Sequence, residues 1–195
     1  MTGCVEIGGG DIQPTLYYTL EPVPAVTASG TAEVETFVVG LGKIEMPDYL
    51  DRKEIVVRKR RNELRYTANN LWAERPGDSL PRVLALNISR QSNSPVEVHA
   101  LPWNDYANPG VVILVEVHAL EGQESPSARV NLEVSWSIQS LPDGVVLKKG
   151  SYQSSGLSWN TGDYADLAKS LSDELAALGR LIGSDLAEIH ETFFK

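Results

Sequence analysis

The chain has 195 residues, of which 42% are hydrophobic and 22% are charged, and this composition suits a single domain with its own core. The formal net charge of −9 argues against sequence-independent binding to nucleic acid or to an anionic membrane surface, because both need net cationic attraction. No segment approaches the roughly 18 consecutive apolar residues of a membrane-spanning helix, so any membrane attachment is expected to be covalent or peripheral.

The first part of the chain is predicted to be a tether followed by strands. Residues 1–14 are rich in glycine and have no periodicity, so we expect a flexible tether there and a single domain over residues 15–195. Residues 16–20 are aromatic and lie between prolines, which predicts an edge or first strand. Apolar residues alternate over 37–46, and this strand is expected to stop at Pro47, because proline cannot donate to a β-ladder.

A turn and a hairpin are predicted next. Residues 47–52 indicate one short turn or a single helical turn, with a proline suited to its start and an aspartate suited to its positive end. A strand is expected to resume at 55–57, to turn at 61–63 and to return over 64–66. Residues 69–76 are predicted to be irregular.

The middle of the chain predicts a helix and two strands. Apolar residues recur at helical spacing over 80–88, with Ser79 as a candidate N-cap and Pro81 in the first turn, where proline is tolerated. Residues 96–100 predict another strand. The long β-branched run over 111–120 predicts a central strand, in which His118 is expected to be a hydrogen-bonded structural histidine.

The last part of the chain predicts a hairpin and a long helix. Apolar and polar residues alternate over 130–136, and a turn leads into a second strand over 145–152. Asp163 can cap a helix whose apolar stripe continues to Ile189. Two glycines in that helix, Gly179 and Gly183, predict a bend or a close helix contact. These elements together predict an α+β fold, in which a middle helix and a long C-terminal helix cover a largely antiparallel sheet in an α/β sandwich.

Residues typical of catalysis or metal binding are scattered in the sequence. The three histidines lack the spacing of a metal site. The residues around Ser158 resemble a nucleophile elbow but lack the last glycine of that motif. We therefore expect no catalytic residues, no metal and no cofactor. An enzyme stays the weakest of the alternatives, because catalytic residues can be brought together by the fold alone.

A basic cluster lies at the predicted hairpin tip and has two interpretations. It consists of Arg58, Lys59, Arg60, Arg61 and Arg65. The first interpretation is a solvated tip whose charges discourage edge pairing. The second is a contact with phospholipid headgroups or with an acidic partner protein. The cluster has too few aromatic residues for a nucleic-acid platform.

Several weak motifs, in order, carry a family resemblance that covers nearly the whole chain. They comprise an opening strand, the turn and hairpin, and residues of the closing helix, namely 16–20, Pro47, Tyr49, Leu50, Asp51, Arg52, Ile55, Val56, Asn62, Leu64, Trp72, Ala73, Glu74, Tyr164, Leu171, Ser172, Leu175 and Leu178. In these residues the chain resembles the PqiC-like auxiliary lipoproteins of bacterial ABC-type transport systems, which accompany Mce-domain lipid transporters. The resemblance implies a non-enzymatic outer-membrane lipoprotein that docks with a periplasm-spanning partner and supports lipid trafficking and envelope integrity. The alternative is a general periplasmic envelope-assembly scaffold without a transporter partner.

Cys4 is the candidate for lipid attachment. The residues before it, Thr2 and Gly3, resemble the end of a bacterial lipobox, although Met1 stands where a leucine is usual. Val5 follows the cysteine where an aspartate would retain a lipoprotein in the inner membrane, so the resemblance implies the periplasmic face of the outer membrane. The other interpretation of Cys4 is an incidental thiol.

The turn after the first long strand is the candidate partner-binding site. Its residues are Met46, Pro47, Tyr49, Leu50, Asp51 and Arg52. We expect the turn to project from the sheet edge, with Tyr49 and Leu50 as apolar anchors inside a polar rim. The competing interpretation is that both side chains fold inward and cap the sheet. Self-association through the same turn is a further alternative, because a ring around a periplasmic conduit needs a repeated contact.

Overall fold

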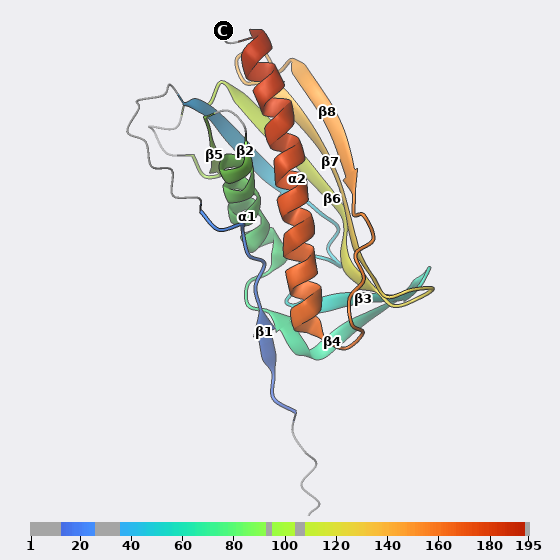
Figure 1. Ribbon diagram of the computed structural model, residues 1–195. Coiled ribbons are helices and arrows are strands. Elements are labelled where there is room, and N and C mark those ends of the chain that lie inside the picture. Colours follow the sequence, from blue (N-terminus) through green and yellow to red (C-terminus); the bar gives the residue numbers. More distant parts are fainter. Residues whose placement is uncertain (1–12, 26–35, 93–94, 104–107, 194–195) are drawn as a thin grey trace, which may run out of the picture.

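The computed structural model describes residues 13–25, 36–92, 95–103 and 108–193. These residues form one eight-stranded sheet and two helices that lie side by side across one face of it (Figure 1). The elements in chain order are β1 (Leu16–Tyr18), β2 (Phe37–Glu45), β3 (Glu54–Arg60), β4 (Glu63–Trp72), α1 (Pro76–Gln91), β5 (Val96–Ala100), β6 (Val111–Gln123), β7 (Arg129–Ser140), β8 (Val146–Gln153) and α2 (Tyr164–Phe193). The predicted α+β fold, with a middle and a C-terminal helix, is confirmed.

Strand β6 lies at the centre of the sheet, as its β-branched run predicts. One of its edges pairs with β7 along nearly the whole strand. The other edge is shared by two strands: β2 pairs with its first half, up to Glu45 opposite Glu116, and β3 pairs with its end, where Val57 lies opposite Gly122. Between these two segments the ladder along this edge is interrupted.

The sheet is mixed, so the prediction of a largely antiparallel sheet needs correction. The hairpin pairs β3–β4, β6–β7 and β7–β8 are antiparallel, whereas β1–β4, β2–β5, β2–β6 and β3–β6 are parallel. The physical reason lies in the connection between β2 and β3. Both strands run parallel to β6, so the turn between them shifts the chain along the edge of β6 and does not reverse its direction, as a hairpin turn would.

Two local predictions around α1 are wrong. Ser79 does not cap the helix, which begins earlier, with Arg75 at the N-cap position and Pro76 in the first turn, so that Pro81 lies one turn further inside. The stretch predicted to be irregular continues β4 as far as Trp72. The end of β4 is held by parallel pairing with β1, a contact between segments far apart in the sequence.

The two helices pack closely because α2 carries glycine where it crosses α1. A Cβ atom placed on Gly179 would lie 2.6 Å from Cβ of Asn87, and one placed on Gly183 would lie 3.2 Å from Cα of Ser92. The predicted close helix contact is therefore confirmed. Asp163 caps α2, since its Oδ1 accepts the backbone N–H of Asp166 at 3.0 Å. Within the described residues, neither helix combines the length and the apolar character needed to cross a membrane.

Candidate partner-binding cleft

The connection between β2 and β3 is the short turn that the sequence predicts. The N–H of Leu50 donates to the carbonyl of Pro47 at 2.9 Å, and the N–H of Arg52 donates to the carbonyl of Leu50 at 2.9 Å. Pro47 is exposed and Met46 is partly buried against the core. The turn therefore closes on itself through its own backbone, and its remaining side chains are fixed by contacts with three different elements.

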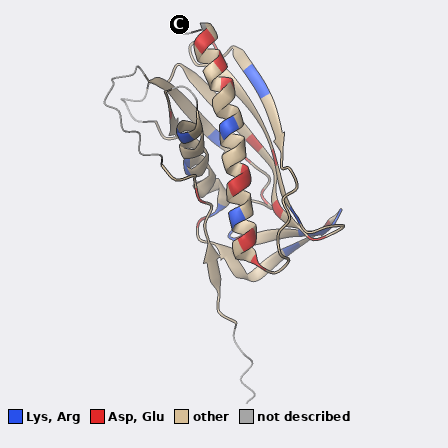
Figure 2. Ribbon diagram, viewed as in Figure 1, with Lys and Arg blue, Asp and Glu red and all other residues tan. Residues whose placement is uncertain are grey.

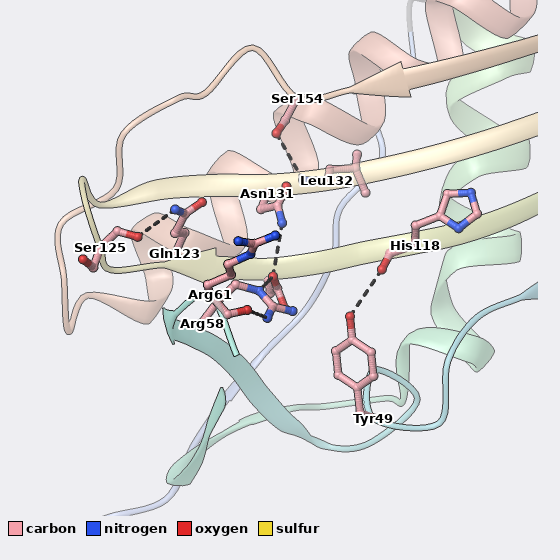
Figure 3. A network of polar contacts seen from close by, with 10 residues as sticks. Tyr49, Arg58, Arg61, His118, Gln123, Ser125, Asn131, Leu132 and Ser154 are labelled. Carbon is pink, nitrogen blue, oxygen red and sulfur yellow. Dashed lines mark hydrogen bonds and ion pairs between the residues drawn. The ribbon is translucent and has the colours of Figure 1, made fainter. Parts of the chain in front are cut away.

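Leu50 and Tyr49 face inward, which contradicts the expectation that they are surface anchors. The side chain of Leu50 is only 1% exposed and belongs to the hydrophobic core. Tyr49 is half-buried, and its hydroxyl donates to the carbonyl of His118 on β6 at 3.3 Å (Figure 3). Burial raises the pKa of the Tyr49 phenol, and the negative charge of the Glu121 carboxylate raises it further. Both side chains cap the sheet, as the competing interpretation states.

Asp51 connects the turn to the beginning of α1. Its Oδ1 accepts the N–H of Gly77 at 3.0 Å, and its Oδ2 lies 3.8 Å from the guanidinium of Arg75. Arg75, at the N-cap position, makes no capping bond of its own. Asp51 thus supplies from outside the helix the acceptor that an N-cap side chain would normally give, at the end where the helix dipole favours a negative charge.

Arg52 is held by two neighbours. Its guanidinium donates to both carboxylate oxygens of Glu54, at 3.1 and 3.0 Å. The same guanidinium lies 4.0 Å above the ring centroid of Tyr66, as a cation–π contact. The hydrogen bonds from Arg52 lower the pKa of the Glu54 carboxyl. Arg52 therefore braces the turn against the β3–β4 hairpin.

A cleft of about 550 Å³ opens between this turn, the end of β2 and the beginning of α1. Met46 and Asp48 form part of its wall on the turn side, and Pro81 and the exposed Leu101 line it elsewhere. Asp48 is exposed and has no ion-pair partner among the described residues. The turn thus offers the partly buried Met46 and the exposed Pro47 and Asp48 to another molecule. Leu50, Asp51 and Arg52 fasten the turn to the core, to α1 and to the hairpin, and Asp51 also lines the cleft.

The basic cluster at the β3–β4 hairpin is divided by ion pairs that the sequence does not reveal. Arg58 donates to both oxygens of Glu121, through Nε and, at 3.1 Å, through Nη2. The Glu121 side chain is 0% exposed and also accepts from Asn131 at 3.1 Å, so Arg58 and Asn131 both donate to it. Figure 3 shows the side chains of Arg58 and Asn131 pointing toward one another. Arg65 pairs with Glu124 at 2.6 Å. The interpretation of a solvated tip is therefore wrong for Arg58, whose partner is buried.

The other candidate residues do not converge on a chemical site. The Nε2 of His118 lies 2.9 Å from Oγ of Ser135, so this histidine is hydrogen-bonded as expected, although its ring is exposed. Ser158 lies in an exposed loop segment. Over the described residues, no three histidine, cysteine or acidic side chains gather where they could hold a metal ion. Cys4 and most of the predicted tether lie outside the described residues.

Comparison with solved structures identifies the fold. A protein described only as uncharacterized aligns with a TM-score of 0.70 and 19% identity, over 89% of this chain and 99% of its own. A DUF330 protein from Xanthomonas campestris aligns with a TM-score of 0.71 and 13% identity, over 88% of this chain and 94% of its own. A PelC dodecamer from Paraburkholderia phytofirmans aligns with a TM-score of 0.49 and 13% identity, over 80% of this chain and 94% of its own, too weakly to bear on assembly.

Sequence comparison identifies the family. No curated protein matches the chain. The family model described as an ABC-type transport auxiliary lipoprotein component matches residues 18–183, from β1 into the last turns of α2. This match covers most of the chain and includes both the turn and the elements that hold it. The chain therefore belongs to the family of ABC-type transport auxiliary lipoprotein components.

Proposed function

We infer that this protein is a non-enzymatic lipoprotein of the outer membrane that docks on a periplasm-spanning, Mce-type component of an ABC lipid transport system. The observation that carries the inference is the family match over residues 18–183. The anchor would be an acylated Cys4, and the described domain would act by binding its partner, without chemistry of its own. The resulting contact would support lipid movement between the two membranes and the integrity of the envelope.

The cleft beside the turn is the proposed docking surface. Leu50, Asp51 and Arg52 hold the turn against the core, the helix and the hairpin, so Met46, Pro47 and Asp48 are presented in one conformation. A preorganised surface loses little conformational entropy when a partner binds, which favours recognition through few side chains. The partner segment would place an apolar side chain against Met46 and Leu101 and a cation near Asp48.

A double substitution at the cleft, called the turn variant, tests the docking surface. Leu101→Ser with Asp48→Lys removes an exposed apolar contact and reverses the free charge, while it leaves Met46 and the side chains that hold the turn in place. Capture of the purified Mce-domain partner should fall at least about tenfold, a loss on the scale of 1.4 kcal/mol, and the melting temperature should stay near that of the parent. The control is Asp173→Lys on α2, an exposed acid whose i,i+4 pair with Lys169 contributes little. Capture equal to that of the parent would place the docking surface elsewhere.

The anchor is tested separately in the full-length precursor. Cys4→Ser should abolish incorporation of labelled fatty acid and move the protein out of the membrane fraction. Separation of inner and outer membranes then identifies the location of the parent. If labelling and membrane recovery are unchanged in the variant, Cys4 is an incidental thiol and the anchor lies elsewhere.

The second candidate function is an envelope-assembly scaffold that uses the same cleft without a transporter. Genes beside this one discriminate the two, because a transporter operon would also encode an ATPase, a permease and an Mce-domain protein. Self-association is tested in the same experiments by sedimentation of the parent and of the turn variant. A scaffold without a transporter would fail to retain the Mce-domain protein under any condition.

A further inference from the structure

Three cations near the β3–β4 hairpin tip have no carboxylate partner among the described residues. Arg58 and Arg65 are neutralised by Glu121 and Glu124, whereas no ion pair is formed by Lys59, Arg61 or Arg129. Arg129 belongs to this group through the sheet register, because Gln123 of β6 pairs both with Arg58 of β3 and with Arg129 of β7. Neighbouring strands lie about 4.8 Å apart, so the backbone of Arg129 lies two strands and about 10 Å from that of Arg58, at the same end of the sheet.

A fourth cation at the tip is only loosely paired. Arg60 lies 3.6 Å from Glu63, and the two side chains are 81% and 52% exposed. An exposed pair of this kind contributes little and exchanges readily with another anion. Lys59, Arg60, Arg61 and Arg129 are called the basic tip below. It is a local excess of positive charge on a chain whose net charge is −9.

The chain enters the fold in the same half of the molecule. Strand β1 runs parallel to the last residues of β4, with Leu16 opposite Asn70, whereas the hairpin tip lies at the other end of β4. The described part of the N-terminal segment, from Gln13, lies at the β3–β4 end, and the C-terminal end of α2 lies at the opposite end (Figure 1). Figure 2 shows basic residues on the hairpin at this end. A chain held to a membrane by its N-terminus would turn the half of the molecule that carries β1 and the hairpin toward the bilayer.

We propose that the basic tip contacts the headgroups of anionic phospholipids in the membrane to which the chain is anchored, an inference that rests on the proposed lipoprotein function. A protein interface needs a desolvated apolar centre, and the exposed large hydrophobic residues include none over 58–63; Leu157, which is 42% exposed, lies beside Arg129 at the margin of the tip. Long, mobile cations without an apolar centre suit phosphate headgroups better. Leu16 and Tyr17, which are 50% and 62% exposed on β1, add the kind of side chains that lie at a membrane interface.

The overall negative charge does not prevent this contact. Charges further than about 10 Å from the surface are largely screened at 0.1 M salt. The helix α2 extends away from the β3–β4 end, so the acids in its last turns lie far from it (Figure 1). Asp163 and Asp166, at the start of α2, lie nearer to β1 than the basic tip does. The contact therefore depends on the hairpin residues and not on the net charge, and it weakens as the salt concentration rises.

The test uses the Cys4→Ser protein, which carries no acyl chain, and vesicles of phosphatidylcholine with or without phosphatidylglycerol. Sedimentation with the vesicles should require phosphatidylglycerol and should weaken with added salt. The triple variant Lys59→Gln, Arg61→Gln and Arg129→Gln should lower the apparent affinity at least about tenfold, because each basic residue near an anionic surface contributes attraction. A matched control, Lys148→Gln, Lys149→Gln and Arg180→Gln, removes the same charge from β8 and from the second half of α2, away from β1. Its affinity should stay within about threefold of the parent.

Two outcomes would overturn the proposal. Binding that does not depend on phosphatidylglycerol excludes a headgroup contact and leaves the basic tip to an acidic protein partner. Equal losses in the triple variant and in the control show that only net charge matters. Neither outcome bears on acylation of Cys4 or on capture of the Mce-domain partner, which are measured in other experiments. Conversely, failure of acylation leaves the vesicle measurement interpretable, because the protein used there carries no lipid.

Discussion

The buried pair of Arg58 and Glu121 gives the sharpest test of what holds the hairpin to the centre of the sheet. Arg58→Met removes the cation but keeps most of its volume, and it leaves the carboxylate of Glu121, which is 0% exposed, with Asn131 as its remaining donor. Removing one partner of a buried pair costs about 3 to 5 kcal/mol, because the other charge stays buried without compensation. For a domain of this size, that loss corresponds to a fall in melting temperature of about 10 °C.

Two further variants separate the cost of an orphaned charge from the value of the pair. The double variant Arg58→Met with Glu121→Met removes both charges, and its free energy of unfolding should return to within about 1 kcal/mol of the parent. Arg60→Met, which removes a cation whose partner Glu63 is exposed, should cost less than about 1 kcal/mol. Urea unfolding followed by circular dichroism measures all of them. A stable Arg58→Met protein, or a double variant as unstable as the single one, would refute the assignment of Glu121 as a buried charge compensated by Arg58.

Three other predictions concern the turn and the helices. Asp51→Ala removes the acceptor at the start of α1 and should lower the free energy of unfolding by about 1 kcal/mol, whereas Asp48→Ala should leave thermal unfolding unchanged. Gly179→Ala should destabilise by about 1 to 3 kcal/mol in urea, because its Cβ would collide with α1; Gly183→Ala, with a contact of 3.2 Å, should cost less. Glu54, whose folded pKa is lowered from 4.5, stabilises the protein above that pH, and this contribution is lost as the pH falls through the lowered value. The stability difference between the parent and Glu54→Gln should therefore be present at neutral pH and vanish in acid; a difference that persists there would contradict the assignment.

Elements with a strong period of their own were predictable from the sequence. The run of β-branched residues in β6, the alternation in β7 and the long apolar stripe of α2 each carry enough local signal to identify the element. The cap at Asp163 and the close contact at Gly179 followed from single residues with one dominant physical preference. In these places local and long-range interactions favour the same structure.

The errors fall where a distant contact decides the structure. The end of β4 has no β pattern, and it is a strand because β1 pairs with one of its edges and the start of β3 with the other. The helix α1 begins before Ser79, because Asp51, which is distant in sequence, supplies the acceptor for its first turn. Leu50 follows an exposed proline and aspartate in a turn, and nothing local shows that the turn folds back onto the core.

The turn itself was predicted from the sequence, but the roles of its residues were not. The turn lies beside a cleft, yet Leu50 fills the core and Arg52 is occupied by Glu54. The partner of Arg58 is Glu121, which lies one residue beyond the strand that the sequence predicts. Exposed and buried residues alternate in the middle of β6 up to His118, and the next four residues are buried in succession. A register shift between Val117 and Ala119 precedes this change, and such a shift cannot be recognised from the residue types alone.

The interrupted edge of β6 determines how this chain can change in length. Because β2 and β3 are each registered on β6 independently, the backbone between them need not keep a fixed number of residues for either strand to stay in place. In the gap between Glu116 and Gly122, the Tyr49 hydroxyl reaches the carbonyl of His118, so a side chain takes the place of a ladder bond. Insertions and deletions during evolution should therefore be tolerated before Tyr49, at the rim of the cleft, and be rejected between Tyr49 and Arg52. The rim can then diverge to suit a new partner while the sheet beneath it keeps its register.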